Sequence, residues 1–417
     1  MPRIETPVDR HQADADSQRE FQRSARETDI GTHDRHRSLH VLTITPFYPR
    51  ARDGASGCFV AEPLTNLIGL GMRSTVFAVE ALYRQKPEKS RSAPEAQWFR
   101  YPSLPGGLGL ASAGFGLYLR LRGAVGALHK RNPIDLIHAH GALPCGHAAH
   151  LLSRRLKVPY VVSVHGLDAF SDLQVGGRAG ASCARVSKRV YAGARRVIGI
   201  SQHVCDAVRQ GMDGGVALSA VYNGADTDVF QPAEDAGPQS LLTVGNLIPV
   251  KGHAIVVKAL AAVLPEFPGL RWEVIGDGPE LNRVCELAAT LGVVESILFR
   301  GRVGRREVAE AYGRCTVFVL PSRYEGLGCV YLEAMASGKV AIGCTGQGIE
   351  EVIRHGDDGW LVPPDGLAEL IDGLRILLRD GARRKRIGAM ARDTILQSFT
   401  LQHQAERLLN VYRECLV

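Results

Sequence analysis

Short apolar runs alternate along the chain with longer stretches in which apolar residues recur every three or four positions. Leu39–Ile44, Tyr160–Val164 and Val317–Leu320 are examples of the short runs, and each is followed by Gly, Pro or a polar loop. Such runs are typical of strands buried on both faces, and the longer stretches between them are typical of amphipathic helices. The alternation predicts an α/β fold in which helices cover parallel sheets.

The chain is too long for one hydrophobic core, because 417 residues exceed the usual size of a single domain. Pro232, Gly237 and Pro238 mark a linker near the middle. The polar N-terminal segment has no apolar run, so we expect a disordered extension and not a signal peptide. The predicted parts are an extension (1–37), a first domain (38–230), a linker (231–239), a second domain (240–395) and a last helix that packs back on the first domain (396–417).

The net charge limits the classes of ligand that the protein can bind, and the cysteine content indicates its redox compartment. A formal net charge of +7 favours anionic ligands, but aromatic residues make up only 6% and no nucleic-acid-binding motif is present, so we expect no nucleic-acid partner. Nine cysteines without a C-x-x-C pair favour free thiols in a reducing compartment. No stretch is apolar for long enough to span a membrane, so the sequence predicts a cytoplasmic protein.

The segment from Val317 to Gly338 carries the strongest chemical signal. A buried strand ends at Pro321, and Gly326, Leu327 and Gly328 lead into a helical pattern. Phosphates bind at such junctions, because the first amides of a helix lack intrahelical partners and glycine lets the backbone approach a ligand. Glu325 and Glu333 lie on either side of the junction, where one could meet a sugar and the other a ribose. The alternative is a surface loop whose glutamates are solvated.

These residues resemble a known signature. P-S-x-x-E-G-x-G followed by E-A-M-A-x-G is similar to the donor site of family 4 retaining glycosyltransferases, which have the GT-B fold of two facing Rossmann-like domains. The resemblance runs from about residue 39 to the end, and is greatest to bacterial teichuronic-acid and exopolysaccharide enzymes. It implies that Glu325 lies by the donor sugar and phosphates and that Glu333 binds the ribose.

The second half holds more of the family's donor pattern. Lys251, beside a glycine at a predicted helix start, could neutralise a leaving diphosphate, or it could be a solvated surface cation. The family has Gly-Arg-Leu before this Lys-Gly pair, whereas Asn246 follows Gly245 here. Lys251 then acts with backbone amides alone, or a residue such as Arg323 substitutes. The resemblance also places the turn at Gly276 and Asp277, and the strand end at Val303, around the base.

The first half offers acceptor candidates. Gly54 and Gly57 follow the first strand, in a loop that either cradles a phosphate or simply turns. His140 and His165-Gly-Leu-Asp168 stand at predicted strand ends, where ligands of open α/β sheets gather, although a lone histidine is usually structural. The resemblance implies that these residues face the interdomain cleft. We expect Glu325, Lys251 and His140 to be catalytic.

Two further segments have alternative interpretations. The helical pattern from Phe115 to Arg131 is basic and amphipathic, so it either contacts an anionic membrane or is a core-facing helix with a solvated face. The Asp226-x-Asp228 pair sits beside Asn223-Gly224, a context typical of turns, so we expect no metal site there.

The expected activity is transfer of a sugar from a nucleoside-diphosphate sugar to an acceptor hydroxyl with retained anomeric configuration, in cell-surface polysaccharide or glycolipid synthesis. The expected partners are a nucleotide-sugar and a glycan or lipid-linked acceptor, with peripheral contact at the cytoplasmic membrane face, and no cofactor or metal is expected. A sugar-nucleotide epimerase of the same fold and a non-catalytic sugar-nucleotide-binding protein are the alternatives. A dinucleotide-dependent oxidoreductase is disfavoured, because the first strand leads to Pro46–Pro49 and not to G-x-G-x-x-G.

Overall fold

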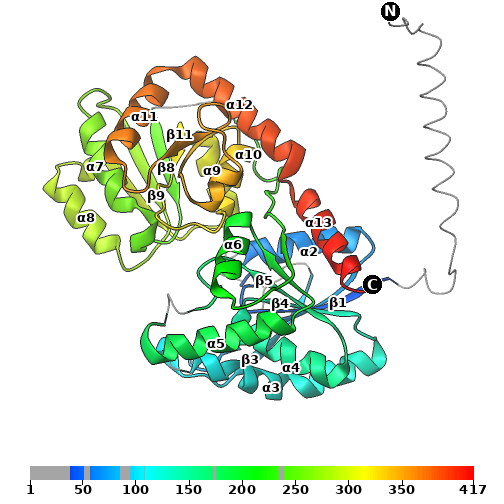
Figure 1. Ribbon diagram of the computed structural model, residues 1–417. Coiled ribbons are helices and arrows are strands. Elements are labelled where there is room, and N and C mark those ends of the chain that lie inside the picture. Colours follow the sequence, from blue (N-terminus) through cyan, green and yellow to red (C-terminus); the bar gives the residue numbers. More distant parts are fainter. Residues whose placement is uncertain (1–37, 51–56, 85–93, 108, 172–174, 234–238) are drawn as a thin grey trace, which may run out of the picture. The chain divides into compact units, whose positions relative to one another are not determined.

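The structure is a computed structural model that describes residues 38–50, 57–84, 94–107, 109–171, 175–233 and 239–417. Within it, two parallel sheets follow one another along the chain and define an N-terminal and a C-terminal lobe (Figure 1). The predicted α/β fold with two Rossmann-like domains is confirmed.

The N-terminal sheet has seven parallel strands in the order β3-β2-β1-β4-β5-β6-β7. All residues of the central strands β1, β4 and β5 are buried, because helices cover both faces of the sheet. The strands are β1 (His40–Thr45), β2 (Arg73–Ala81), β3 (Ala96–Tyr101), β4 (Leu136–His140), β5 (Tyr160–Val164), β6 (Arg196–Gly199) and β7 (Leu218–Ala220).

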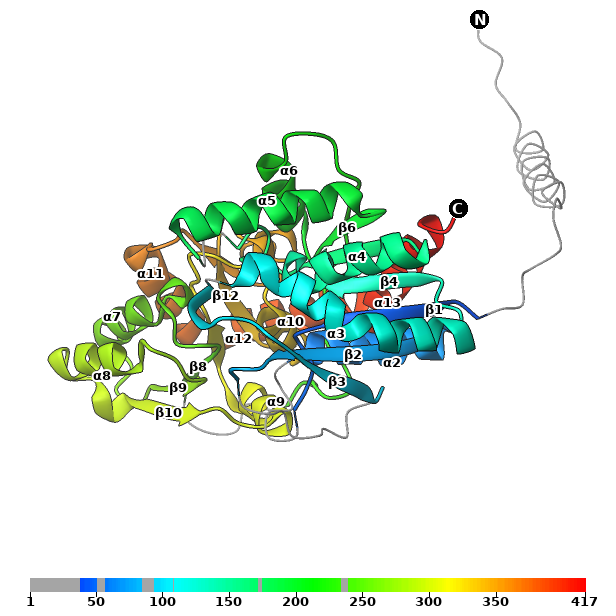
Figure 2. The ribbon, with the colours of Figure 1, turned by 90° about the horizontal axis from the view of Figure 1, so that it is seen from below.

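Three helices of this lobe, α3, α4 and α5, pack against one another as one layer on a single face of the sheet (Figures 1 and 2). Helix α6 begins at Gln202 behind Ser201, whose hydroxyl accepts a hydrogen bond from the Val204 amide (3.1 Å), so Ser201 is the N-cap of this helix. The helices are α2 (Cys58–Gly69), α3 (Leu110–Arg131), α4 (His147–Leu156), α5 (Gly177–Gly193) and α6 (Gln202–Gly211), with short helical turns at Pro105–Gly107 and Ala142–Gly146.

Two stretches differ from the sequence prediction. Residues 84–114 are rich in charge and then in Gly, Pro and Ser without a clear period, which predicts an irregular segment. In the structure, Ala96–Tyr101 instead forms β3, a parallel edge strand along β2. An edge strand is covered less than a central one, and most of β3 is only half-buried, so the apolar run that marks a central strand is missing. Val221 and Tyr222, before the Asn223-Gly224 turn, predict a strand that begins at Val221, and this prediction is wrong as well. Strand β7 ends at Ala220, and beyond it Ala225 forms an isolated bridge with Thr400.

The C-terminal sheet has six parallel strands in the order β10-β9-β8-β11-β12-β13. Its strands are β8 (Ser240–Val244), β9 (Arg271–Ile275), β10 (Ile297–Gly301), β11 (Val317–Val319), β12 (Val340–Cys344) and β13 (Trp360–Val362). Its helices are α7 (His253–Val263), α8 (Leu281–Thr290), α9 (Arg305–Arg314), α10 (Cys329–Ala336), α11 (Leu367–Arg379) and α12 (Gly381–Ser398), with 3-10 turns at Pro249–Lys251, Val294–Ser296 and Gly348–Glu351.

The last helix, α13 (Leu401–Glu414), packs on α2 of the N-terminal lobe. Its Tyr412 is fully buried, and the Tyr412 hydroxyl lies 2.7 Å from His138 Nδ1 in β4. The C-terminal end of the chain therefore helps to build the core of the first lobe. None of the helices in the described ranges is long and apolar enough to cross a membrane.

Candidate active site

A cavity of about 380 Å³ is lined by residues of both lobes. The C-terminal lobe contributes the loops after β8, β9 and β10 and the start of α10, and the N-terminal lobe contributes Gly57, Cys58 and Phe59 at the start of α2. Ligands of open α/β sheets bind outside the carboxyl ends of strands, which is where this cavity lies.

Glycine is required where two of these loops meet. Gly276 has a φ of +145°, and a Cβ at this position would lie 1.9 Å from the carbonyl oxygen of Gly245. No side chain fits at such a distance, so the G-D-G turn keeps the loops after β8 and β9 together. Of the residues predicted to bind the donor, Gly245, Asn246, Gly276 and Val303 line the cavity, whereas Asp277 does not and instead accepts a hydrogen bond from the Gly278 amide (2.8 Å).

One end of the cavity is suited to phosphate. The Lys251 ammonium forms an ion pair with the Glu325 carboxylate, and both side chains are less than one-fifth exposed. Helix α10 begins beside them at Cys329, with Gly328 as its N-cap at φ +82° and no acidic residue in its first turn. The first amides of a helix have no intrahelical acceptor, so cationic and amide donors meet at this end.

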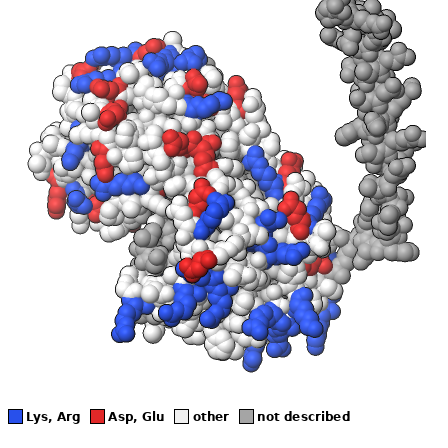
Figure 3. All heavy atoms as spheres, viewed as in Figure 1, with Lys and Arg blue, Asp and Glu red and all other residues white. Residues whose placement is uncertain are grey.

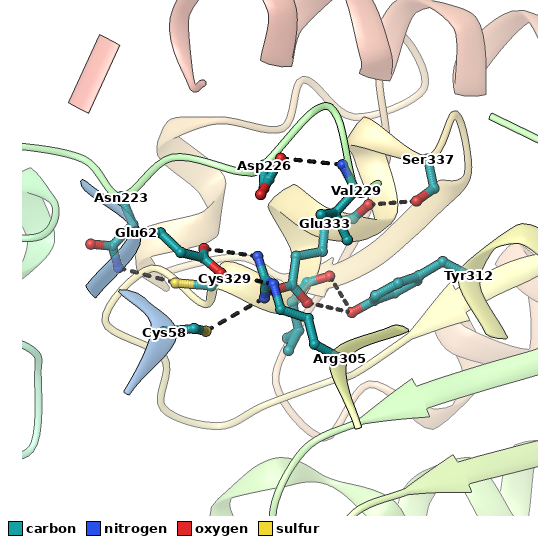
Figure 4. Close-up of polar contacts among 11 residues, drawn as sticks. Cys58, Glu62, Asn223, Asp226, Val229, Arg305, Tyr312, Cys329, Glu333 and Ser337 are labelled. Atoms are coloured by element: carbon teal, nitrogen blue, oxygen red, sulfur yellow. Dashed lines mark hydrogen bonds and ion pairs between the residues drawn. The ribbon is translucent and has the colours of Figure 1, made fainter. Parts of the chain in front are cut away.

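The other end is built around Glu333 in α10, a carboxylate that is buried in the C-terminal lobe (Figure 4). Arg305 Nη1 donates to Glu333 Oε1 (3.1 Å), and the Tyr312 hydroxyl is shared between Glu333 Oε2 (3.3 Å) and the Val330 carbonyl (2.9 Å). Burial raises the pKa of Glu333, although Arg305 opposes the shift. Glu333 and Glu325 line the same cavity.

Arg305 joins the two lobes. Its Nη2 donates to Glu62 Oε2 of α2 (2.8 Å), and its guanidinium lies over the Phe230 ring, 4.7 Å from the centroid. Burial raises the pKa of Glu62 to about 7, against the opposing effect of Arg305. Glu333 and Asp226 raise the same pKa, because three carboxylates surround one guanidinium here.

Arg302 lies beside Asn246, the position where the family has an arginine, and nothing in the sequence pattern distinguishes Arg302. Arg302 lines the cavity, and its Nη2 donates to Asn246 Oδ1 (3.4 Å). Arg323, the substitute considered from the sequence, pairs with Asp365 (2.7 Å) and does not line this cavity. Arg302 therefore brings a guanidinium to the place where the family's Arg is absent.

Comparison with known proteins identifies the family. The model described as Glycosyltransferase Family 4 matches residues 59–229, and the model described as Glycosyl transferases group 1 matches residues 225–394. The chain belongs to glycosyltransferase family 4. It is therefore a sugar-transferring enzyme, and these matches do not favour an epimerase or a non-catalytic binding protein.

Relatives of this glycosyltransferase match it over most of the chain. N-acetyl-alpha-D-glucosaminyl L-malate synthase of Bacillus anthracis is 26% identical, over 72% of this chain and 79% of that protein. Sucrose-phosphate synthase from Thermosynechococcus elongatus superimposes with a TM-score of 0.75 at 20% identity, over 90% of this chain and 98% of that one. HepE from Anabaena, in complex with UDP-glucose, gives a TM-score of 0.70 at 20% identity, over 90% of this chain and 100% of that one. The structural matches show a GT-B fold.

The two histidines predicted to face the cleft, His140 and His165, lie beside the main cavity and do not line it. His140 Nδ1 is 3.0 Å from His165 Nε2, and the His165 amide donates to Asp168 Oδ1 (2.8 Å). Both histidines line a smaller cavity of about 20 Å³, and Phe59 lines both cavities. Burial lowers the pKa of His165 to about 4 and raises that of Asp168 to about 6, so His165 is neutral at pH 7.

The remaining predicted residues fall in different places. Gly57 lines the main cavity, whereas Gly54 lies outside the described residues. Gly326 and Leu327 are buried against the N-terminal lobe and the sheet and do not line the cavity, although the Gly326 carbonyl accepts from Ser201 Oγ (2.5 Å).

Asp226 Oδ1 accepts from the amides of Asp228 (3.1 Å) and Val229 (3.2 Å), the expected turn geometry. No described group of three His, Cys, Asp or Glu is placed to hold a metal ion.

Proposed function

We propose that this glycosyltransferase moves a sugar from a nucleoside-diphosphate sugar to an acceptor hydroxyl with retained anomeric configuration. The observation that carries the proposal is that Lys251, Glu325 and Glu333 line one cavity, with the cation and helix amides at one end and the buried carboxylate at the other. A diphosphate fits the first end and ribose hydroxyls fit the second. The complex of HepE with UDP-glucose supports a donor of this class.

In this reaction the bond between the anomeric carbon and the diphosphate oxygen breaks while a bond to the acceptor oxygen forms, and the proton of the acceptor hydroxyl passes to the departing diphosphate. Lys251, Arg302 and the first amides of α10 stabilise the negative charge that develops on the departing diphosphate. Glu325 lies beside them and faces the sugar end of the donor. The proposed chemistry uses these side chains and amides without a cofactor.

The acceptor side of the proposal rests on the N-terminal lobe. His140 and His165 border the small cavity next to Phe59, and we assign them to positioning the acceptor hydroxyl and the transferred sugar. The acceptor is a glycan or a lipid-linked glycan of cell-surface polysaccharide or glycolipid synthesis.

A lipid-linked acceptor requires contact with a membrane surface, and the layer formed by α3, α4 and α5 supports that contact. These helices contain Lys and Arg but no Asp or Glu, and Figure 3 shows cationic side chains concentrated over this part of the molecule. Phe115 and Leu119, one turn apart on α3, are 52% and 44% exposed. Exposed apolar residues among cations are typical of a surface that lies on anionic lipid.

The decisive experiment measures donor binding and product together. A panel of UDP-, GDP- and ADP-sugars is screened by calorimetry, and the product formed with an acceptor is analysed by NMR for its anomeric configuration. Binding of one donor and retention of configuration are expected. Failure of all donors to bind, a product with inverted configuration, or a changed donor sugar without acceptor would contradict the proposal.

A further inference from the structure

Glu62 is a half-buried carboxylate of the N-terminal lobe that does not line the main cavity but binds a residue that does. It lies on α2, and both of its oxygens are 2.8 Å from the Arg305 guanidinium, Oε1 from Nε and Oε2 from Nη2. Glu62 is 20% exposed and Arg305 is 19% exposed, so water competes little for this pair. The other terminal nitrogen of Arg305, Nη1, binds Glu333.

This arrangement fixes the direction in which Glu333 presents its oxygens. A carboxylate has about four acceptor positions, and Arg305 and Tyr312 occupy one on each oxygen of Glu333. The remaining positions are available to two adjacent hydroxyls, such as those of a ribose. If Arg305 were free to rotate, it could compete with those hydroxyls for the same oxygens.

Glu62 prevents that rotation. The guanidinium is planar and rigid, so the hydrogen bond from Nη2 to Glu62 Oε2, together with the close charge contact between Nε and Glu62 Oε1, also sets the direction of Nη1. The Phe230 ring supports one face of the fork at 4.7 Å. Figure 4 shows Arg305 between Glu62 on one side and Glu333 with Tyr312 on the other.

We propose that Glu62 is a positioning residue for the donor nucleotide: through Arg305 it orients the Glu333 carboxylate toward the ribose hydroxyls. This inference rests on the proposed function, because it assumes a nucleoside-diphosphate donor. It makes donor affinity depend on a residue of the opposite lobe that does not touch the donor. The same helix carries Phe59, whose ring is 5.0 Å from that of His165, so α2 connects the two histidines to the ribose end of the site.

The experiment measures the contribution of the ribose hydroxyls to binding separately from the contribution of the ligand's charge. UDP, GDP and ADP are first measured by calorimetry on the wild-type protein, and the tightest ligand is then compared with its 2′,3′-dideoxy analogue. The two ligands carry the same charge, so the ratio of their dissociation constants reports the ribose hydroxyls alone. For wild type we expect a ratio of roughly 10 to 100, the usual effect of losing hydrogen bonds to a charged group.

Glu62→Gln is expected to bring this ratio to within a few-fold of one, as Glu333→Gln does, while thermal unfolding shows a folded protein. Asp213→Asn is the matched control: it removes one carboxylate from an exposed ion pair with Lys188 in the same lobe, and it should keep the wild-type ratio. Should Glu62→Gln not fold, Arg305→Lys takes its place, because lysine keeps the charge but cannot hold both carboxylates through a fork.

The possible results distinguish failure of this inference from failure of the proposed function. A wild-type ratio near one, or a Glu62→Gln ratio equal to that of wild type, overturns the inference and leaves the proposed function standing. If Glu62→Gln changes the dissociation constants of both ligands by the same factor, Glu62 has an electrostatic or structural role, and this result overturns the inference too. If the wild type binds none of the three diphosphates, the proposed function itself fails.

Discussion

The ammonium of Lys251 and the carboxylate of Glu325 form an ion pair across 74 positions of the chain. Lys251 ends the short 3-10 turn before α7, and Glu325 lies in the loop between β11 and α10. Gly252 lets these loops touch, since its φ is +75° and a Cβ there would lie 2.2 Å from the Pro321 carbonyl oxygen. In the proposed reaction, the donor diphosphate therefore meets an ammonium group that is already held in place by Glu325 and that pairs with both.

Replacing Lys251 by Met should lower kcat by roughly 10² to 10³, the usual effect of removing one group that stabilises charge in a transition state. Donor affinity should change less, because the negative charge on the leaving diphosphate grows as the bond breaks. Steady-state kinetics with the donor identified by calorimetry measures both effects. Lys258→Met is the control, since Lys258 is exposed on α7 and does not line the main cavity. Equal kcat values for the two variants would refute the assignment.

Arg302 should contribute to holding the diphosphate. Arg302→Gln is expected to weaken binding of a nucleoside diphosphate by roughly 10-fold while leaving binding of the corresponding nucleoside unchanged, because only the diphosphate carries charge. Adding Asn246→Arg to this variant should restore part of the lost affinity, since the two side chains are in contact. Calorimetry with both ligands on the single and double variants is the measurement. If nucleoside binding were lost as well, Arg302 would contact the nucleotide base and not the diphosphate alone.

Much of this site could be predicted because it is local in sequence or lies at strand ends. Glu325, Glu333 and the α10 start fall within one strand-loop-helix segment, and Lys251 follows a parallel strand of the same sheet. The carboxyl ends of parallel strands share one edge, so β-α periodicity alone places these residues near one another.

Contacts between residues that are far apart in the chain could not be predicted in this way. Arg305 and Glu62 are 243 positions apart, and Tyr412 and His138 are 274 apart. Periodicity shows which face of a helix is buried but not which residue of another lobe it meets. Arg305 stands two positions after Val303 in a stretch rich in arginine, where nothing in the pattern distinguishes it from its exposed neighbour Arg306.

His253 should make the protein less stable in acid. It is buried at the start of α7, neither ring nitrogen has a partner among the described residues, and burial lowers its pKa from 6.5 to about 4. The unfolded chain binds this proton below pH 6.5 but the folded chain only near pH 4, so stability is full above pH 6.5 and falls as pH falls. The loss is about 1 kcal/mol at pH 5.5 and approaches about 3 kcal/mol at pH 4.

The His253→Leu variant isolates this effect. Its unfolding free energy, measured by urea denaturation at pH 7.5 and pH 5.5, should fall less than that of wild type by about 1 kcal/mol. Glu62 and Asp168, whose pKa values are raised to about 7 and 6, change stability in the opposite direction in both proteins and so cancel in the comparison. Parallel pH profiles for variant and wild type would show that His253 does not titrate as stated.

Charge reversal on α3 should weaken membrane binding strongly if the basic layer is the membrane contact. Arg120 and Arg122 are exposed on α3 near Phe115 and Leu119, and each cation close to an anionic surface contributes about 1 kcal/mol. Wild type should sediment with phosphatidylglycerol vesicles but not with phosphatidylcholine vesicles, and high salt should release it. The double variant Arg120→Glu/Arg122→Glu should lose at least 10-fold in partition, and Phe115→Ser should lose a smaller amount. Lys385→Glu/Arg386→Glu on α12 makes the same charge change in the C-terminal lobe and should still bind, so an equal loss there would point to net charge instead of a defined surface.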